Sequence, residues 1–170
     1  PAKVQSALLE AMAERQVSVG STTYGLPDLF LVMATQNPIE QEGTYPLPEA
    51  QLDRFLMHVS VGYPDTAAET EILQLTRTEA TRDTDAPPIP LTQESVFAAR
   101  QEILALHMSD AVEQYMVQLV IATRSPARYS EQLASWIEYG GSPRATIAID
   151  RCARAHAWLK GRDFVSPDDI

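Results

Sequence analysis

Two arginines and one asparagine, spread along the sequence, have the side-chain chemistry of a phosphate-binding site. Asn37 follows an apolar run at 29–35, and its amide could contact a phosphate oxygen and an attacking water together, because it both donates and accepts hydrogen bonds. Arg54 and Arg144 each carry a guanidinium, which is always charged and holds phosphate or carboxylate oxygens with two parallel hydrogen bonds. These three residues together suit a site that binds phosphate.

Asn37 and Arg54 also have simpler explanations. An asparagine followed by proline after a strand, as at Asn37-Pro38, commonly forms a turn. Arg54 ends an expected short helix, where a cation stabilises the helix dipole or forms a salt bridge with Asp53 or Glu49. The residues alone leave both explanations open.

Arg144 lies in the first turn of an expected helix that is opened by Gly140-Gly141-Ser142-Pro143. The free backbone amides and the positive dipole end at a helix start favour an anion, so a cation there is unfavourable on local grounds. We therefore expect a negatively charged ligand close to Arg144.

Two apolar runs of strand length, at 29–35 and 55–61, are expected to position Asn37 and Arg54. Continuous apolar runs are typical of parallel strands that are covered on both faces. Between them the sequence predicts a loop and a short helix that begins at Pro48 and ends near Arg54. A strand, a helix and a second strand predict a parallel pairing, with Asn37 at the carboxyl end of the first strand, where ligands bind in α/β sheets.

The remaining elements divide the chain into two expected domains, an α/β part at 1–62 and a helical part at 63–170. Before the first strand, the periodicity predicts a helix over 2–15 and a hairpin over 16–26 that turns at Gly20-Ser21. The helical part is predicted to contain helices at 66–78, 92–105, 110–123, 130–138 and 143–160, with an exposed loop at 80–90. Ser166-Pro167 reads as the start of a last helix that the chain does not finish.

The amino-acid composition argues against nucleic acid and a membrane as partners of this chain. The net charge of −10 and the pI near 4.6, with only two lysines, argue against a general affinity for nucleic acid. No apolar run approaches the roughly 18 residues that a membrane span needs, so we expect a cytoplasmic protein. The single cysteine excludes an internal disulfide framework. The pair Asp168-Asp169 is expected to be solvated.

The amino-acid sequence around these residues resembles that of the MoxR branch of the AAA+ ATPases. The resemblance rests on Thr35-Gln36-Asn37-Pro38, on the stretch from Gln41 to Phe55, on Lys3 to Met12 and on Gly-Ser-Pro-Arg-Ala at 141–145. It implies that Asn37 is the sensor 1 residue, Arg54 the arginine finger and Arg144 the sensor 2 residue. The implied fold is the C-terminal part of a P-loop NTPase core followed by a helical lid.

This resemblance implies ATP hydrolysis, with Mg²⁺, at the subunit boundaries of a ring, most often a hexamer. Asn37 would position the attacking water, Arg54 would reach the neighbouring subunit's nucleotide, and Arg144 would report the state of the nucleotide to the lid. The family further implies a chaperone-like role in maturing metal-dependent enzymes or other complexes, often with a partner that bears a von Willebrand factor A domain.

The sequence contains no Gly-x-x-x-x-Gly-Lys-Ser/Thr loop, and no apolar strand in it ends in an acidic pair that would hold magnesium. We therefore expect a fragment that cannot hydrolyse ATP alone and binds ATP and Mg²⁺ poorly. We expect its strand part to pack against a missing half, to self-associate, or to be partly disordered. Two alternatives remain: a non-enzymatic helical interaction module at 65–170, and a DNA-remodelling relative that uses the 16–26 hairpin, which the negative charge disfavours.

Overall fold

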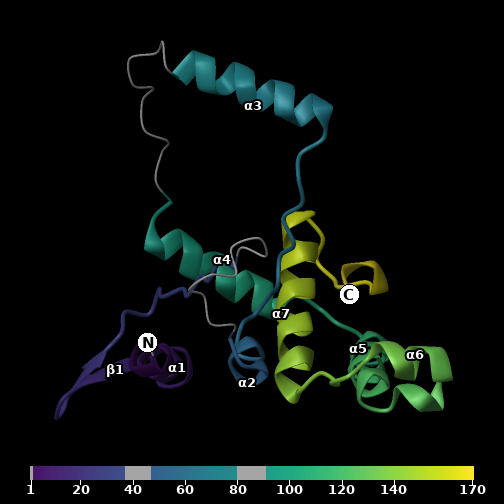
Figure 1. Ribbon diagram of the computed structural model, residues 1–170. Coiled ribbons are helices and arrows are strands. Elements are labelled where there is room, and N and C mark those ends of the chain that lie inside the picture. Colours follow the sequence, from purple (N-terminus) through teal and green to yellow (C-terminus); the bar gives the residue numbers. More distant parts are fainter. Residues whose placement is uncertain (1, 37–46, 80–90) are drawn as a thin grey trace.

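The computed structural model describes residues 2–36, 47–79 and 91–170, and it is largely helical. Helix α1 (Ala2–Glu14) and a small hairpin lie together at one side, and the later helices lie beyond them (Figure 1). Asn37 falls outside these ranges, as do the expected loop at 80–90 and most of the loop that follows Asn37.

The helix and hairpin predicted at the start of the chain are confirmed. Strands β1 (Gln16–Val19) and β2 (Thr22–Gly25) pair in antiparallel register, and Gly20 takes a φ of 63° in the turn. The Glu10 carboxylate of α1 accepts hydrogen bonds from the Ser18 amide at 3.0 Å and from its hydroxyl at 2.6 Å. These bonds lower the pKa of Glu10 and fasten the hairpin to the helix.

The parallel strands predicted at 29–35 and 55–61 are not formed, because the described residues contain only the two-stranded antiparallel sheet. A strand exists only where a neighbouring strand supplies its hydrogen bonds, and a strand buried on both faces also needs cover. Here Leu31 is 78%, Met33 80% and Val61 90% exposed. The apolar pattern is therefore suited to more burial than the described residues supply, although Val32 and Phe55 are partly buried.

The predicted helices are confirmed, with small shifts at their ends. Their bounds are α2 (Glu49–Leu52), α3 (Thr66–Glu79), α4 (Gln93–Ala105), α5 (Asp110–Arg124), α6 (Glu131–Trp136) and α7 (Pro143–Leu159), with 3-10 turns η1 (Pro126–Arg128) and η2 (Pro167–Asp169). Serine or threonine side chains cap α4, α5, α6 and α7, as the N-cap preference requires. No helix in the described ranges has the length and apolar character to cross a membrane.

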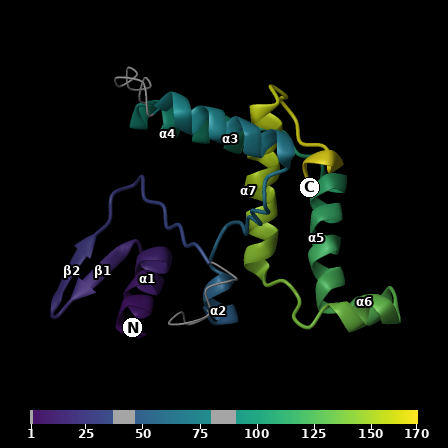
Figure 2. The same ribbon diagram turned by 45° about the horizontal axis from the view of Figure 1, so that its top comes forward.

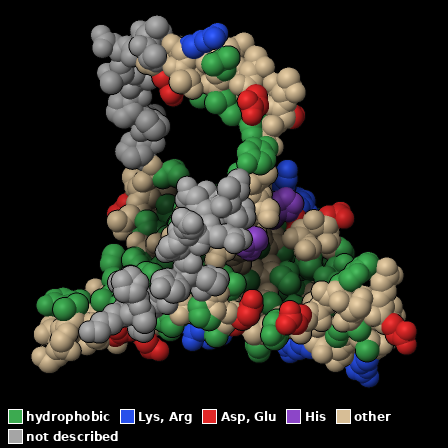
Figure 3. Space-filling model, viewed as in Figure 1, with side chains coloured by type: hydrophobic (Ala, Val, Ile, Leu, Met, Phe, Trp, Pro, Cys, Tyr) green, Lys and Arg blue, Asp and Glu red, His purple; other side chains and the backbone are tan. Residues whose placement is uncertain are grey.

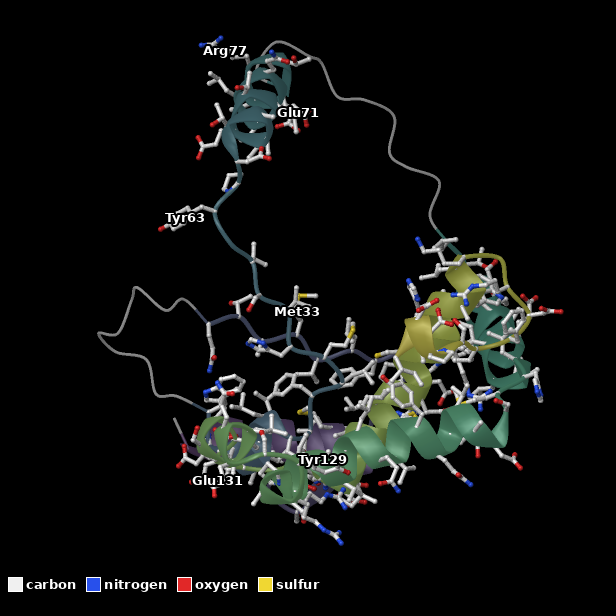
Figure 4. All side chains as sticks on the ribbon, turned by 90° about the vertical axis from the view of Figure 1, so that its right-hand side faces the viewer. Met33, Tyr63, Glu71, Arg77, Tyr129 and Glu131 are labelled. Carbon is white, nitrogen blue, oxygen red and sulfur yellow. The ribbon has the colours of Figure 1, made fainter. Side chains whose placement is uncertain are left out.

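Helix α3 stands apart from the other helices in Figure 1 and contains no buried residue. Ile72, Leu73 and Leu75 are each at least half exposed, and hydrophobic side chains reach the surface along this arm (Figure 3). Tyr63, in the linker below α3, projects away from the chain, and Met33 lies lower, on the extended segment (Figure 4). Other described residues therefore leave these apolar side chains largely exposed to solvent.

The main core lies in the helical part, where α7 packs beside α5 (Figure 2) and also contacts α4. The core consists of Met108, Val112, Met116, Ala153, Ala157 and Val165, with Leu106, Ile149 and Ile170 packed against it. The two alanines are fully buried, which lets the helices approach closely.

Asp169 is not solvated as predicted, because its side chain is fully buried near this core. It accepts hydrogen bonds from the guanidinium of Arg162, from the backbone and hydroxyl of Ser166, and lies 2.7 Å from Nδ1 of His156. The Arg162 hydrogen bond is the largest cause that holds the pKa of Asp169 well below its usual range. The carboxylate thus ties η2 to the end of α7.

Candidate functional site

The Gly140-Gly141 loop fixes where α7 begins. The amide of Gly141 donates to the Thr123 hydroxyl at 2.8 Å, and Nε of Arg124 donates to the Gly141 carbonyl at 2.7 Å. A Cβ on Gly140 would lie 2.6 Å from the Cα of Arg124, so only glycine allows this approach. The end of α5 therefore sets the position of the first turn of α7.

That first turn carries Arg144. The hydroxyl of Ser142 accepts a hydrogen bond from the Arg144 amide at 3.1 Å and caps the helix. A guanidinium nitrogen of Arg144 lies 2.8 Å from Oδ2 of Asp53, and the two side chains are 55% and 30% exposed. Sequence reasoning expected a negatively charged ligand here, and the structure places a carboxylate of the same chain there instead.

Asp53 joins the two sequence regions that carry the predicted arginines. A hydrogen bond from the Ser142 side chain is the largest cause that lowers the pKa of Asp53, and the charges of Arg144 and Arg54 lower it further. Asp53 is thus a carboxylate at neutral pH that connects the end of α2 with the start of α7. Sequence reasoning named Asp53 only as a partner for Arg54, because nothing local brings it to Arg144.

Arg54 is held by its own helix rather than by an acid. One guanidinium nitrogen donates to the carbonyl of Ala50, and Nε is buried with no hydrogen-bond partner. Neither of the proposed salt bridges, with Asp53 or with Glu49, is formed among the described residues. Within the described ranges, no carboxylate is in direct contact with the Arg54 guanidinium, although its charge acts on Asp53.

Both arginines line one open groove of about 370 Å³ between α1, the end of α2 and α7. Its lining residues are Met12, Ala13, Asp53, Arg54, Phe55, Leu56, Arg144, Ile147, Ala148 and Arg151. A groove of this size with arginines and apolar walls suits a phosphate-bearing ligand of moderate size. Within the described ranges, no cluster of three or more His, Cys, Asp and Glu side chains could hold a metal ion, and Asp53 is the one carboxylate that lines the groove.

The groove brings together Arg54 and Arg144 of the three predicted site residues, and Asn37 lies outside the described residues. Arg151 was missed by sequence reasoning. It is seven positions after Arg144 on the same helix, and residues at that spacing share a helix face. This spacing was the available signal.

Two protein families match parts of the chain. Residues 1–57 match the ATPase family associated with various cellular activities (AAA), and residues 133–170 match the AAA lid domain. The chain therefore combines part of an AAA fold with a helical AAA lid.

Named relatives agree on the branch. The chain is 47% identical over 174 residues to Chaperone MoxR1 of Mycobacterium tuberculosis, covering 100% of this chain and 44% of that protein. It is 33% identical to Protein MoxR of Methylorubrum extorquens, covering 99% and 51%. A crystal structure of a Cytophaga hutchinsonii protein superposes with a TM-score of 0.88 at 48% identity, covering 99% of this chain and 51% of the other. The chain belongs to the MoxR-type AAA ATPases, and it spans about half the length of the relatives it matches.

Proposed function

We propose that this chain supplies the boundary arginines and the lid of a MoxR-type AAA ATPase that hydrolyses ATP, with Mg²⁺, in a ring oligomer. The division into a core part at 1–62 and a lid part at 63–170 belongs to this proposal. The observation that supports this proposal best is the 2.8 Å contact between Asp53 and Arg144. Because Arg54 follows Asp53 directly in the sequence, this contact places Arg54 and the lid residue Arg144 in the same groove.

In this arrangement Arg54 and Arg144 contact the same nucleotide, which is bound by the adjacent subunit. The sequence contains no phosphate-binding loop, so the chain's own contribution is a pair of guanidiniums that stabilise charge on the phosphate groups. Asp53 orients Arg144 and neutralises it when no phosphate is present. Asn37 is proposed to position the attacking water, as the family resemblance implies.

The Arg54→Ala variant of the full-length protein tests this function. An arginine finger contributes about 10³ to 10⁵ in rate, so we expect hydrolysis to fall by that factor while nucleotide binding within each subunit persists. Arg128→Ala is the matched control, because Arg128 is exposed on η1 and does not line the groove. Its replacement removes the same charge at a distant position. Unchanged hydrolysis in Arg54→Ala would remove Arg54 from this role.

Mixed rings test whether the arginines act across the boundary. Subunits unable to bind nucleotide are combined with Arg54→Ala subunits, each inactive alone. If Arg54 acts on the neighbouring subunit's nucleotide, we expect mixed rings to recover hydrolysis. At some subunit boundaries, the intact nucleotide site of an Arg54→Ala subunit then faces the intact Arg54 of the other kind of subunit. No recovery in rings shown to contain both subunits would place the arginine's action within its own subunit.

The proposed output of hydrolysis is chaperone-like remodelling of a client protein or complex, with a von Willebrand factor A domain protein as partner. Similarity to Chaperone MoxR1 of Mycobacterium tuberculosis supports the chaperone role. A second candidate function, a helical interaction module, is favoured by the exposed apolar residues of α3. If Arg54→Ala retains full client remodelling, this second function applies.

A further inference from the structure

One face of α7 lines the groove over two helical turns. Arg144, Ile147, Ala148 and Arg151 all contribute to the lining, at the i, i+3, i+4 and i+7 positions of one helix stripe. Seven residues of helix span about 10.5 Å, and the long arginine side chains at both ends can converge on one ligand between them. The groove therefore has a cation at each end of its α7 wall.

Arg151 differs from the next arginine on the same helix. Nε of Arg154 donates to Asp150 at 2.8 Å, and a second nitrogen donates to the Leu106 carbonyl, so structural contacts occupy that side chain. Arg151 is exposed, and no ion pair or hydrogen bond joins its side chain to any other residue in the described part of the chain. Folding of the lid therefore does not use the charge of Arg151.

The charges around the groove do not cancel. Its lining contains three guanidiniums, from Arg54, Arg144 and Arg151, and a single carboxylate, Asp53, which Arg144 already engages. This excess of positive charge occurs in a chain whose net charge is −10. Guanidiniums gathered on a concave surface repel one another unless an anion joins them, so the arrangement calls for an anion with several charges.

We propose that Arg151 is a third phosphate-binding arginine, which contacts the phosphate chain of the nucleotide held by the adjacent subunit, together with Arg54 and Arg144. This inference rests on the proposed function. A polyphosphate fits better than a single phosphate because its oxygens extend along the groove and meet cations at both ends of the α7 wall. Ile147 and Ala148 supply the apolar lining between the two arginines of α7.

The test measures how tightly assembled rings of the full-length protein bind a non-hydrolysable ATP analogue, alongside the rate of hydrolysis. We expect Arg151→Ala to weaken analogue binding about tenfold and to lower the rate of hydrolysis at subsaturating ATP by a similar factor, since charge-assisted hydrogen bonds are lost. Arg151→Lys should recover part of the affinity, because a lysine keeps the charge without the two-pronged contact. Arg128→Ala should match the wild type.

The outcomes separate this inference from the function on which it rests. If Arg54→Ala abolishes hydrolysis but Arg151→Ala behaves as Arg128→Ala does, the proposed function stands and the role of Arg151 is refuted. If Arg54→Ala itself leaves hydrolysis unchanged, the proposed function fails. If Arg151→Ala weakens ring assembly in analytical ultracentrifugation, yet rings at high protein concentration bind the analogue normally, Arg151 binds the neighbour's protein surface and the inference is overturned.

Discussion

Replacing Gly140 by alanine should destabilise the lid and displace Arg144. A Cβ at this position would lie 2.6 Å from the Cα of Arg124, 2.8 Å from its amide nitrogen and 2.8 Å from the Thr123 carbonyl oxygen. All three are backbone atoms at the end of α5, so no side-chain rotation can relieve the contact. The loop must move outward by about 0.7–1.4 Å to reach the usual separation of roughly 3.5–4.0 Å between non-bonded heavy atoms.

The size of the effect follows from two opposing contributions. Overpacking costs about 1–3 kcal/mol, whereas replacing glycine by alanine lowers the entropy of the unfolded chain and stabilises by about 0.4–1 kcal/mol. Gly62→Ala isolates the second contribution, because a Cβ on Gly62 meets nothing within 4 Å and its φ is not positive. The difference between the two variants should therefore be about 1–3 kcal/mol in the free energy of unfolding.

Urea denaturation followed by tryptophan fluorescence measures this difference, since Trp136 and Trp158, the chain's two tryptophans, lie in the helical part. The displacement also strains the Gly141 hydrogen bonds to Thr123 and Arg124, which set the start of α7. We therefore expect hydrolysis by full-length Gly140→Ala to fall as well. Equal stability of the two variants would refute the close-approach argument.

Two further predictions concern stability. The pKa of Asp169 is lowered from 3.8, so its carboxylate contributes stability that is present above about pH 4 and is lost as the pH falls toward the lower folded pKa. The Asp169→Asn variant should therefore be less stable at pH 7 and should lose less stability on acidification. An unchanged dependence of the free energy of unfolding on pH would contradict this prediction. Met116→Ala should cost about 2–5 kcal/mol in the free energy of unfolding, because Met116 is only 5% exposed in the core. Leu104→Ala is its control at 62% exposure, and equal losses in chemical denaturation would place Met116 outside the core.

Local signals in the amino-acid sequence are sufficient to predict most of the helices and the hairpin. Apolar positions three and four residues apart predicted the first helix, and serine before proline located the starts of α7 and η2, because these signals act within one or two turns. The Gly20-Ser21 turn set the hairpin for the same reason. The motifs around Arg54 and Arg144 also identified the family, whose branch the named relatives support.

Which of these residues come into contact depends on the packing of segments that are distant in the sequence. Asp53 and Arg144 are 91 positions apart, and their contact depends on the end of α2 lying beside the start of α7. An acidic pair such as Asp168-Asp169 has the local pattern of solvated charges, whereas the burial of the Asp169 side chain depends on contacts with Arg162 and His156. The runs at 29–35 and 55–61 carry strand patterns without strands, because pairing requires neighbours that a local pattern cannot supply. Local propensity thus fixes the elements, whereas contacts between distant segments decide which charges gather into a site.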